Sequence, residues 1–179
     1  MPSQPTGVHH IAYACRDIEE TTRFYEDIIG FPLVHVVIDS NDDGGFMRHA
    51  FFDTGDTTYL AFFDMHDFGE KEGWTPKVSG VNGLPLWVTH IAFRADEARQ
   101  DEVKSRLERA KLKPLMEVDH GWCHSLYIKD PNGIMIELCR DTPGLTPDPK
   151  LAHSRLGDTV RTEPPAKIIL PDQPDRPDR

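Results

Sequence analysis

The sequence predicts an α+β fold built from two tandem modules, each with the order strand, helix, strand, strand, strand. A similar four-residue pattern opens both modules, His-Ile-Ala-Tyr at residues 10–13 and His-Ile-Ala-Phe at residues 90–93. A stretch of helical character follows each pattern and leads to a Pro-containing strand start and then to a hairpin. An internal repeat of this size carries more weight for the fold class than any shorter local signal.

The first module is expected to span residues 7–66. After its opening strand we expect a helix over residues 18–29, a strand that begins at residues 31–34 and a hairpin over residues 46–63. Gly30 follows the helical stretch directly and is the residue at which the helix should end, because glycine is common just past the last helical residue.

The second module is expected to span residues 86–140, so that residues 7–140 form one domain. Its helix is predicted over residues 99–109, its next strand begins at residues 113–116, and its hairpin covers residues 125–139. The remaining residues, 141–179, are rich in Pro and Asp, which no long helix tolerates. We expect an extended tail there, either disordered or wrapped over a neighbouring subunit. The run at residues 167–170 offers a short edge strand.

The hairpin of the second module has a well-defined turn. Residues 130–133 read Asp-Pro-Asn-Gly, and this order favours a type I turn closed by a glycine bulge. Such a loop pairs Asp130 with Ile134. Counting outward from that pair sets Tyr127 opposite Glu137, with both side chains on the same face of the sheet.

Glu137 is the most informative residue of this hairpin, because it interrupts an apolar strand. A buried carboxylate there is costly unless a positive group holds it. A metal ion could do so. The alternatives are a pairing with Lys or Arg, or a side chain that faces solvent.

The two module-opening histidines favour the metal. His10 and His90 occupy matched positions, and together with Glu137 they offer two imidazoles and one carboxylate, the facial set of non-haem iron(II) oxygenases. Either histidine alone would more often be an ordinary core or surface residue. Strand alternation should turn His9 away from this set. In the first module the position equivalent to Glu137 holds Ala61, so three protein ligands and an open side are expected.

Length, charge and cysteine content restrict the classes of protein. The chain has 179 residues and a formal net charge of −10, which disfavours nucleic acid as a partner. No apolar run is long enough to span a bilayer, so no membrane association is expected. The three cysteines, Cys15, Cys123 and Cys139, show no zinc-ligand spacing, and the N-terminus resembles no signal peptide. These features favour the cytoplasm.

These segments together resemble the vicinal oxygen chelate superfamily, which includes glyoxalases, extradiol ring-cleaving dioxygenases, fosfomycin-modifying enzymes and bleomycin-binding proteins. The resemblance covers roughly residues 7–140 and implies curved mixed sheets around a metal cup. Residues 118–137 are most similar to the extradiol pattern: a His, a spacer, a Tyr, then Asp-Pro-x-Gly and a Glu. This resemblance implies that His10, His90 and Glu137 hold iron(II), that Tyr127 hydrogen-bonds a catecholate oxygen, and that His120 lines the pocket.

One departure from the extradiol pattern concerns proton transfer. Many extradiol enzymes carry an acid–base histidine where this chain reads Asp-Thr-Thr-Tyr at residues 56–59. His49 or His66 could substitute. A one-residue register shift decides whether Arg48 or His49 faces the cup.

The sequence therefore predicts an iron(II)-dependent extradiol-type dioxygenase of a small aromatic diol. The alternatives are a glyoxalase- or fosfomycin-type isomerase or transferase, for which Mn(II), Ni(II) or Zn(II) would serve, and a metal-free drug-binding protein of the bleomycin-resistance kind. The expected partners are a small-molecule substrate, possibly catecholic, and a second copy of the chain in a homodimer. Whether the metal ligands come from one chain or from two stays open.

Overall fold

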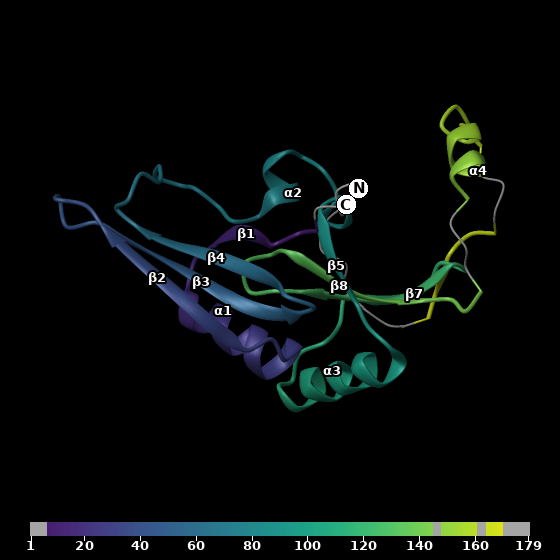
Figure 1. The fold of residues 1–179 in the computed structure, drawn as a ribbon, viewed down its shortest axis with the longest axis horizontal. Coiled ribbons are helices and arrows are strands. Elements are labelled where there is room, and N and C mark those ends of the chain that lie inside the picture. The colour runs from purple at the N-terminus through teal and green to yellow at the C-terminus, as the bar shows by residue number, and fades with distance from the viewer. Residues whose placement is uncertain (1–6, 145–147, 161–163, 170–179) are drawn as a thin grey trace, which may run out of the picture.

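The computed structural model describes residues 7–144, 148–160 and 164–169, and it confirms the α+β class with two curved mixed sheets (Figure 1). The first module contains β1 (His10–Cys15), α1 (Ile18–Arg23), the π-helical segment η1 (Phe24–Ile29), β2 (Leu33–Ser40), β3 (Phe46–Gly55) and β4 (Thr58–His66). The second contains β5 (His90–Arg94), α3 (Glu97–Arg109), β6 (Met116–Asp119), β7 (Cys123–Lys129) and β8 (Met135–Asp141). Between them lie α2 (Val78–Val81) and the 3-10 turn η2 (Leu86–Val88).

The helix predicted over residues 18–29 is present but changes type midway. The Asp17 carboxylate caps its start by accepting from the Glu20 backbone N–H at 2.8 Å. The hydroxyls of Thr21 and Thr22 donate to backbone carbonyls four residues earlier, a contact that often bends helices. The chain continues as η1 and ends at Gly30, whose φ of 85° is the left-handed conformation that glycine adopts without strain.

The two sheets repeat the same strand arrangement. Their orders are β1-β4-β3-β2 and β5-β8-β7-β6-β9, where β9 is Lys167–Ile168, with a parallel pair between the first and last strands of each module. Ala12 is opposite Ala61 in the first sheet, and Ala92 is opposite Glu137 in the second. The predicted equivalence of Ala61 and Glu137 is therefore confirmed.

The main core lies on one face of each sheet, which we call the back face. Phe52 and Phe62 of the first sheet and Leu126 and Ile136 of the second belong to one cluster of buried side chains. Val103 of α3 joins the same cluster, and α1 and α3 lie on the same side of the strands in Figure 1. The opposite faces, which we call the front faces, carry His10 in the first sheet and Glu137 in the second.

A buried polar network joins the two modules across their back faces. The Tyr25 hydroxyl donates to the Asp130 carboxylate at 3.0 Å, and the Asn132 amide donates to the Thr21 hydroxyl at 3.0 Å. The Arg16 backbone N–H donates to the side-chain amide oxygen Oδ1 of Asn132 at 3.1 Å. Burial raises the pKa of Asp130, so the network holds a carboxyl group that is costly to ionise. The turn at residues 130–133 of the second module thus also stabilises the contact with the first module.

We expect Tyr25→Phe to lower the free energy of unfolding by about 1–2 kcal/mol, because it removes one donor from a buried acceptor and leaves packing unchanged. Equilibrium urea unfolding measures this. Tyr59→Phe is the matched control at a half-buried tyrosine outside the network, and it should change stability by less than about 0.5 kcal/mol. Equal losses in the two variants would mean that the hydroxyl of Tyr25 does not stabilise the module contact.

The predicted tail, residues 141–179, lies partly outside the described residues. Where it is described it holds a short helix, α4 (Pro149–Ser154), and a two-residue strand, β9 (Lys167–Ile168). The edge strand expected near residue 167 is present, since β9 pairs antiparallel with β6; Leu170 lies outside the described residues. None of the helices in the described part of the chain is long and apolar enough to cross a membrane.

Candidate metal centre

The hairpin of the second module has the register that its turn predicts. The Asp130 backbone N–H donates to the Ile134 carbonyl at 2.9 Å, and Gly133 has a φ of 79°. Tyr127 consequently lies opposite Glu137 on β7 and β8. Both side chains are nearly buried, with exposed fractions of 8% and 5%.

Glu137 is held by two neighbours on the front face of its sheet. One carboxylate oxygen, Oε2, lies 3.0 Å from His90 Nε2, and the other, Oε1, accepts a short hydrogen bond from the Ser125 hydroxyl. Glu137 does not face solvent, which removes one of the three possibilities that the sequence left open. Both oxygens point toward polar groups on neighbouring strands.

His90 is oriented as a metal ligand would be. Its Nδ1 lies 2.8 Å from the Trp87 carbonyl oxygen, so Nδ1 carries a proton and donates it there. This leaves Nε2 directed at Glu137. Histidine ligands commonly donate their second N–H to a backbone carbonyl in this way. Two adjacent ligands of an octahedral ion with bonds of ~2.1 Å stand about 3 Å apart, which matches the Nε2–Oε2 separation. The residues present therefore fit an ion.

His10 lies away from this pair. Across residues 7–144, 148–160 and 164–169, the group of His, Cys, Asp or Glu side chains that could share an ion does not include His10. It lies instead at the start of β1, with its ring 6.1 Å from that of His49 and 5.5 Å from that of Phe51. The expectation that His9 turns away is wrong, because β1 begins at His10 and alternation does not extend to His9. The Nδ1 atoms of the two rings are 2.8 Å apart.

His120 and Tyr127 form a pair beside Glu137. His120 Nε2 lies 3.0 Å from the Tyr127 hydroxyl. Burial raises the pKa of Tyr127 to about 12, with the nearby Glu137 charge acting in the same direction. The hydroxyl therefore keeps its proton near neutral pH and can donate it in a hydrogen bond.

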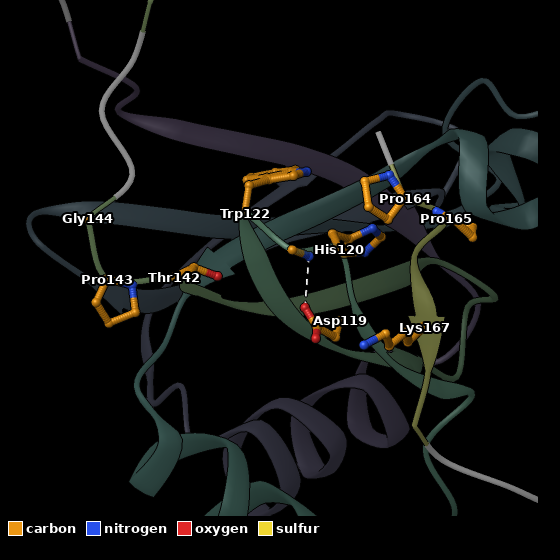
Figure 2. A pocket seen from close by; sticks show the side chains of 10 residues that line it. Asp119, His120, Trp122, Thr142, Pro143, Gly144, Pro164, Pro165 and Lys167 are labelled. Atoms are coloured by element: carbon orange, nitrogen blue, oxygen red, sulfur yellow. Dashed lines mark hydrogen bonds between the residues drawn. The ribbon is translucent and has the colours of Figure 1, made fainter. Parts of the chain in front are cut away.

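A cavity of about 540 Å³ opens beside His120. Its walls come from the loop between β6 and β7, from residues 142–144 and from residues 164, 165 and 167. Figure 2 shows the His120 ring beside Pro164, and its centroid lies 6.1 Å from that of the Trp122 ring. The described part of the tail thus contributes one wall of a cavity that His120 also lines.

The register of the first module decides between Arg48 and His49. Arg48 Nε donates to the buried Asp64 carboxylate at 2.8 Å, and His66 Nε2 lies 2.9 Å from the same oxygen. Both side chains are thus engaged with Asp64. His49 lies instead on the front face, where its ring stacks on Phe63 at 3.7 Å.

Two polar residues of the front face were missed at the sequence level. Ser125 holds Glu137, and Cys123 lies with His120 and Glu137 in a group whose ligand atoms are all within 4.8 Å of one another. Both could have been found, because positions 123, 125 and 127 share one face of a strand. His124, between them, points to the back face, where it pairs with Glu117 at 3.3 Å.

Comparison with known families identifies the class of protein. The family model described as the Glyoxalase/Bleomycin resistance protein/Dioxygenase superfamily matches residues 7–138. The chain belongs to this superfamily. A curated relative, "Glyoxylase I 4" of Arabidopsis thaliana, is 24% identical over 141 residues, which cover 77% of this chain and 72% of the relative.

Solved structures share the fold at low identity. A glyoxylase/bleomycin resistance protein/dioxygenase domain from Frankia sp. EAN1pec is 19% identical, with a TM-score of 0.57 over 79% of this chain and 96% of that one. The genomically encoded fosfomycin resistance protein FosX from Listeria monocytogenes is 18% identical, with a TM-score of 0.52 over 78% and 97%. A mutant of that Listeria protein was solved with Mn(II) and 1S,2S-dihydroxypropylphosphonic acid. At these identities the likeness establishes the fold.

Proposed function

We propose that this chain is a metal-dependent enzyme that binds a small substrate through two neighbouring oxygen atoms. The observation that carries this proposal is the pair formed by His90 Nε2 and Glu137 Oε2 at 3.0 Å, with His90 oriented by the Trp87 carbonyl. In this proposal the ion is held by His90, Glu137 and a third ligand, His10. The bound ion would act as a Lewis acid toward the substrate oxygens.

The third ligand, in this proposal, comes from a second copy of the chain. The two modules of one chain share a core through their back faces, and among the described residues His10 is not in the group of possible ligands that contains Glu137. His10 is exposed at the start of β1, and the His90 side chain is 35% exposed. A two-fold dimer presents the same surface on both copies, so it would form two equivalent sites, each with His10 from one copy and His90 and Glu137 from the other.

For the reaction we favour extradiol-type cleavage of a small aromatic diol, with iron(II) as the ion. Tyr127 would donate a hydrogen bond to one substrate oxygen, and His120 would hold the Tyr127 hydroxyl in place. His49 would accept the proton that the second hydroxyl loses. Its Nε2 is buried and has no hydrogen-bond partner among the described residues, and burial lowers the pKa of His49, which favours the neutral ring.

We expect His49→Gln to lower kcat by about 10²- to 10⁴-fold, because the variant cannot accept a proton. The affinity for Mn(II) should not change, because His49 is not a proposed ligand. His35→Gln is the matched control, since His35 lies on the neighbouring strand against the same Phe51 ring. A His49 variant with wild-type kcat, or with weakened Mn(II) binding, would contradict this role.

A second reaction class keeps the same ligands and does not use dioxygen. A glyoxalase-type isomerase is supported by the relative named as a glyoxylase, and a fosfomycin-type enzyme by the Listeria structure that contains Mn(II) and a dihydroxy phosphonate. For this class the ion would be Mn(II), Ni(II) or Zn(II), and His49 would again be the residue placed to accept a proton.

The deciding experiment is loading with one ion at a time under anaerobic conditions, followed by substrate addition. Oxygen uptake by the iron(II) protein on addition of catechol, with a ring-cleaved product, supports the dioxygenase. Isomerisation of the adduct of methylglyoxal and glutathione by the Mn(II), Ni(II) or Zn(II) protein, without oxygen uptake, favours the glyoxalase class. A wild-type protein that binds none of these ions would contradict both and favour a metal-free binding protein.

A further inference from the structure

We infer that His120, Cys123 and Glu137 form a second metal site, specific for soft divalent ions such as Zn(II) and Cd(II), and that an ion held there inhibits the enzyme. Binding at this site depends only on residues of one chain. The inhibition rests on the proposed function, because it requires that Glu137 also serves the first site.

The donor set distinguishes this site from the first. The first site offers imidazole and carboxylate groups, which suit Fe(II) and Mn(II). The second adds a thiolate, which favours softer ions such as Zn(II). The Cys123 thiol has no exposed surface, and its sulfur lies 3.6 Å from the Ser125 hydroxyl. Cys123 thus has a polar neighbour on its own strand and two further ligand residues, His120 and Glu137, within reach.

The geometry needs only a small adjustment. The three ligand atoms lie within 4.8 Å of one another. Two ligands of a tetrahedral zinc ion stand roughly 3.3–3.7 Å apart, given bonds of about 2.0–2.3 Å. The group must therefore contract by about 1 Å. Cys123 and Glu137 are fixed on adjacent strands, so His120, which follows β6 in a loop, is the residue that moves by side-chain rotation.

Of the three ligands, His120 is the one that lines the cavity described above. The His120 ring lines that cavity (Figure 2), whereas Cys123 and Glu137 are buried and lie within 4.8 Å of His120 by their ligand atoms. An incoming ion would thus meet His120 first and then the two buried ligands. On binding, the Cys123 thiol loses its proton to solvent and a metal–sulfur bond forms, with no change in oxidation state.

Capture of an ion at the second site would disable the first in two ways. Glu137 would be drawn away from His90, its partner at 3.0 Å. If the ion binds His120 through Nε2, the hydrogen bond to the Tyr127 hydroxyl would also be lost. Because Glu137 is common to both sites, the two ions should exclude each other.

Titration of the full-length, metal-free protein with Cd(II) tests this inference, because thiolate coordination produces an ultraviolet charge-transfer band. We expect the band in the wild type and its loss in Cys123→Ser. It should persist in Cys139→Ser, whose thiol contacts that of Cys123 but lies outside the group of three ligands, and in His10→Ala. His120→Ala should weaken Cd(II) binding by more than the roughly 10- to 100-fold typical of an outer-shell partner. This second variant keeps the test valid if Cys123→Ser folds poorly.

The inference is overturned if the wild type shows no band, if the band persists in Cys123→Ser, or if Cys139→Ser loses it equally. Unchanged Cd(II) affinity in His120→Ala would also overturn it. The proposed function would fail on a different result: a protein that binds neither Mn(II) nor iron(II). As a test of inhibition, Cys123→Ser should keep its activity with the harder ion and lose sensitivity to added Cd(II); unchanged sensitivity to Cd(II) would refute the inhibitory role.

Discussion

Glu137→Gln should lose the proposed metal ion and, with it, activity by about 10³-fold or more. The substitution keeps the size of the side chain and its contact with Ser125, but it replaces a charged ligand by a neutral amide. A metal ion in a buried site depends on that charge, since ligand charge offsets the cost of removing the ion from water. Calorimetric titration of the metal-free protein with Mn(II), together with activity, measures the effect.

Glu117→Gln is the matched control for this substitution. Glu117 is also a nearly buried glutamate paired with a histidine on the same sheet, but it lies on the back face, against His124 and Lys104. It should keep the affinity for Mn(II). Retained Mn(II) binding in the Glu137 variant, or equal loss in both variants, would mean that Glu137 is not a ligand.

His10→Ala should cause a loss of similar size, although His10 lies apart from the other proposed ligands within one chain. The variant should keep the fold and the dimer, because the side chain is exposed at the start of a strand. Calorimetric titration with Mn(II), an activity assay and sedimentation together measure this. His9→Ala is the control, since its ring contacts that of His10 but has no counterpart in the second module, where residue 89 is Thr. The His9→Ala variant should lose at most the roughly 10- to 100-fold in metal affinity that is typical of removing an outer-shell partner. Wild-type metal affinity in His10→Ala would remove it from the ligand set.

Much of the second module could be predicted from local signals. The Asp-Pro-Asn-Gly turn has one favoured geometry, and from it the pairing of Tyr127 with Glu137 follows by counting. The equivalence of Ala61 and Glu137 followed from the repeat, because both modules use the same parallel register. These features depend on neighbours along one hairpin or one module, which sequence patterns record.

The relation between the modules could not be predicted in the same way. Whether two sheets meet through their back or their front faces depends on contacts between distant residues, such as Tyr25 with Asp130 and Arg99 with the Ile29 carbonyl. Strand alternation predicts which residues share a face of a sheet, but it does not predict which part of the protein packs against that face. Ser125 is a different case, because alternation already places it on the face of Tyr127; only its short hydrogen bond to Glu137 required the structure.

The position of His49 shows that a one-residue difference in strand register decides which side chain lies on the front face. Arg48 and His49 were both open possibilities, and one step of register separates them. The buried carboxylate of Asp64 settles the matter physically, because it attracts the Arg48 guanidinium to the back face and leaves His49 on the front. Nothing in the local pattern identifies Asp64 as that partner before the strands are paired.

The central claim, that two copies of the chain complete each metal site, is tested most directly by mixing two inactive variants. His10→Ala and His90→Ala homodimers are each expected to be inactive. After unfolding and refolding together in equal amounts, half of the dimers should be mixed, and each mixed dimer should contain one intact site. Activity should therefore return to about a quarter of the wild-type value, with Mn(II) binding restored in proportion. If sedimentation confirms mixed dimers but neither activity nor Mn(II) binding returns, the site is not shared between subunits and the account is wrong.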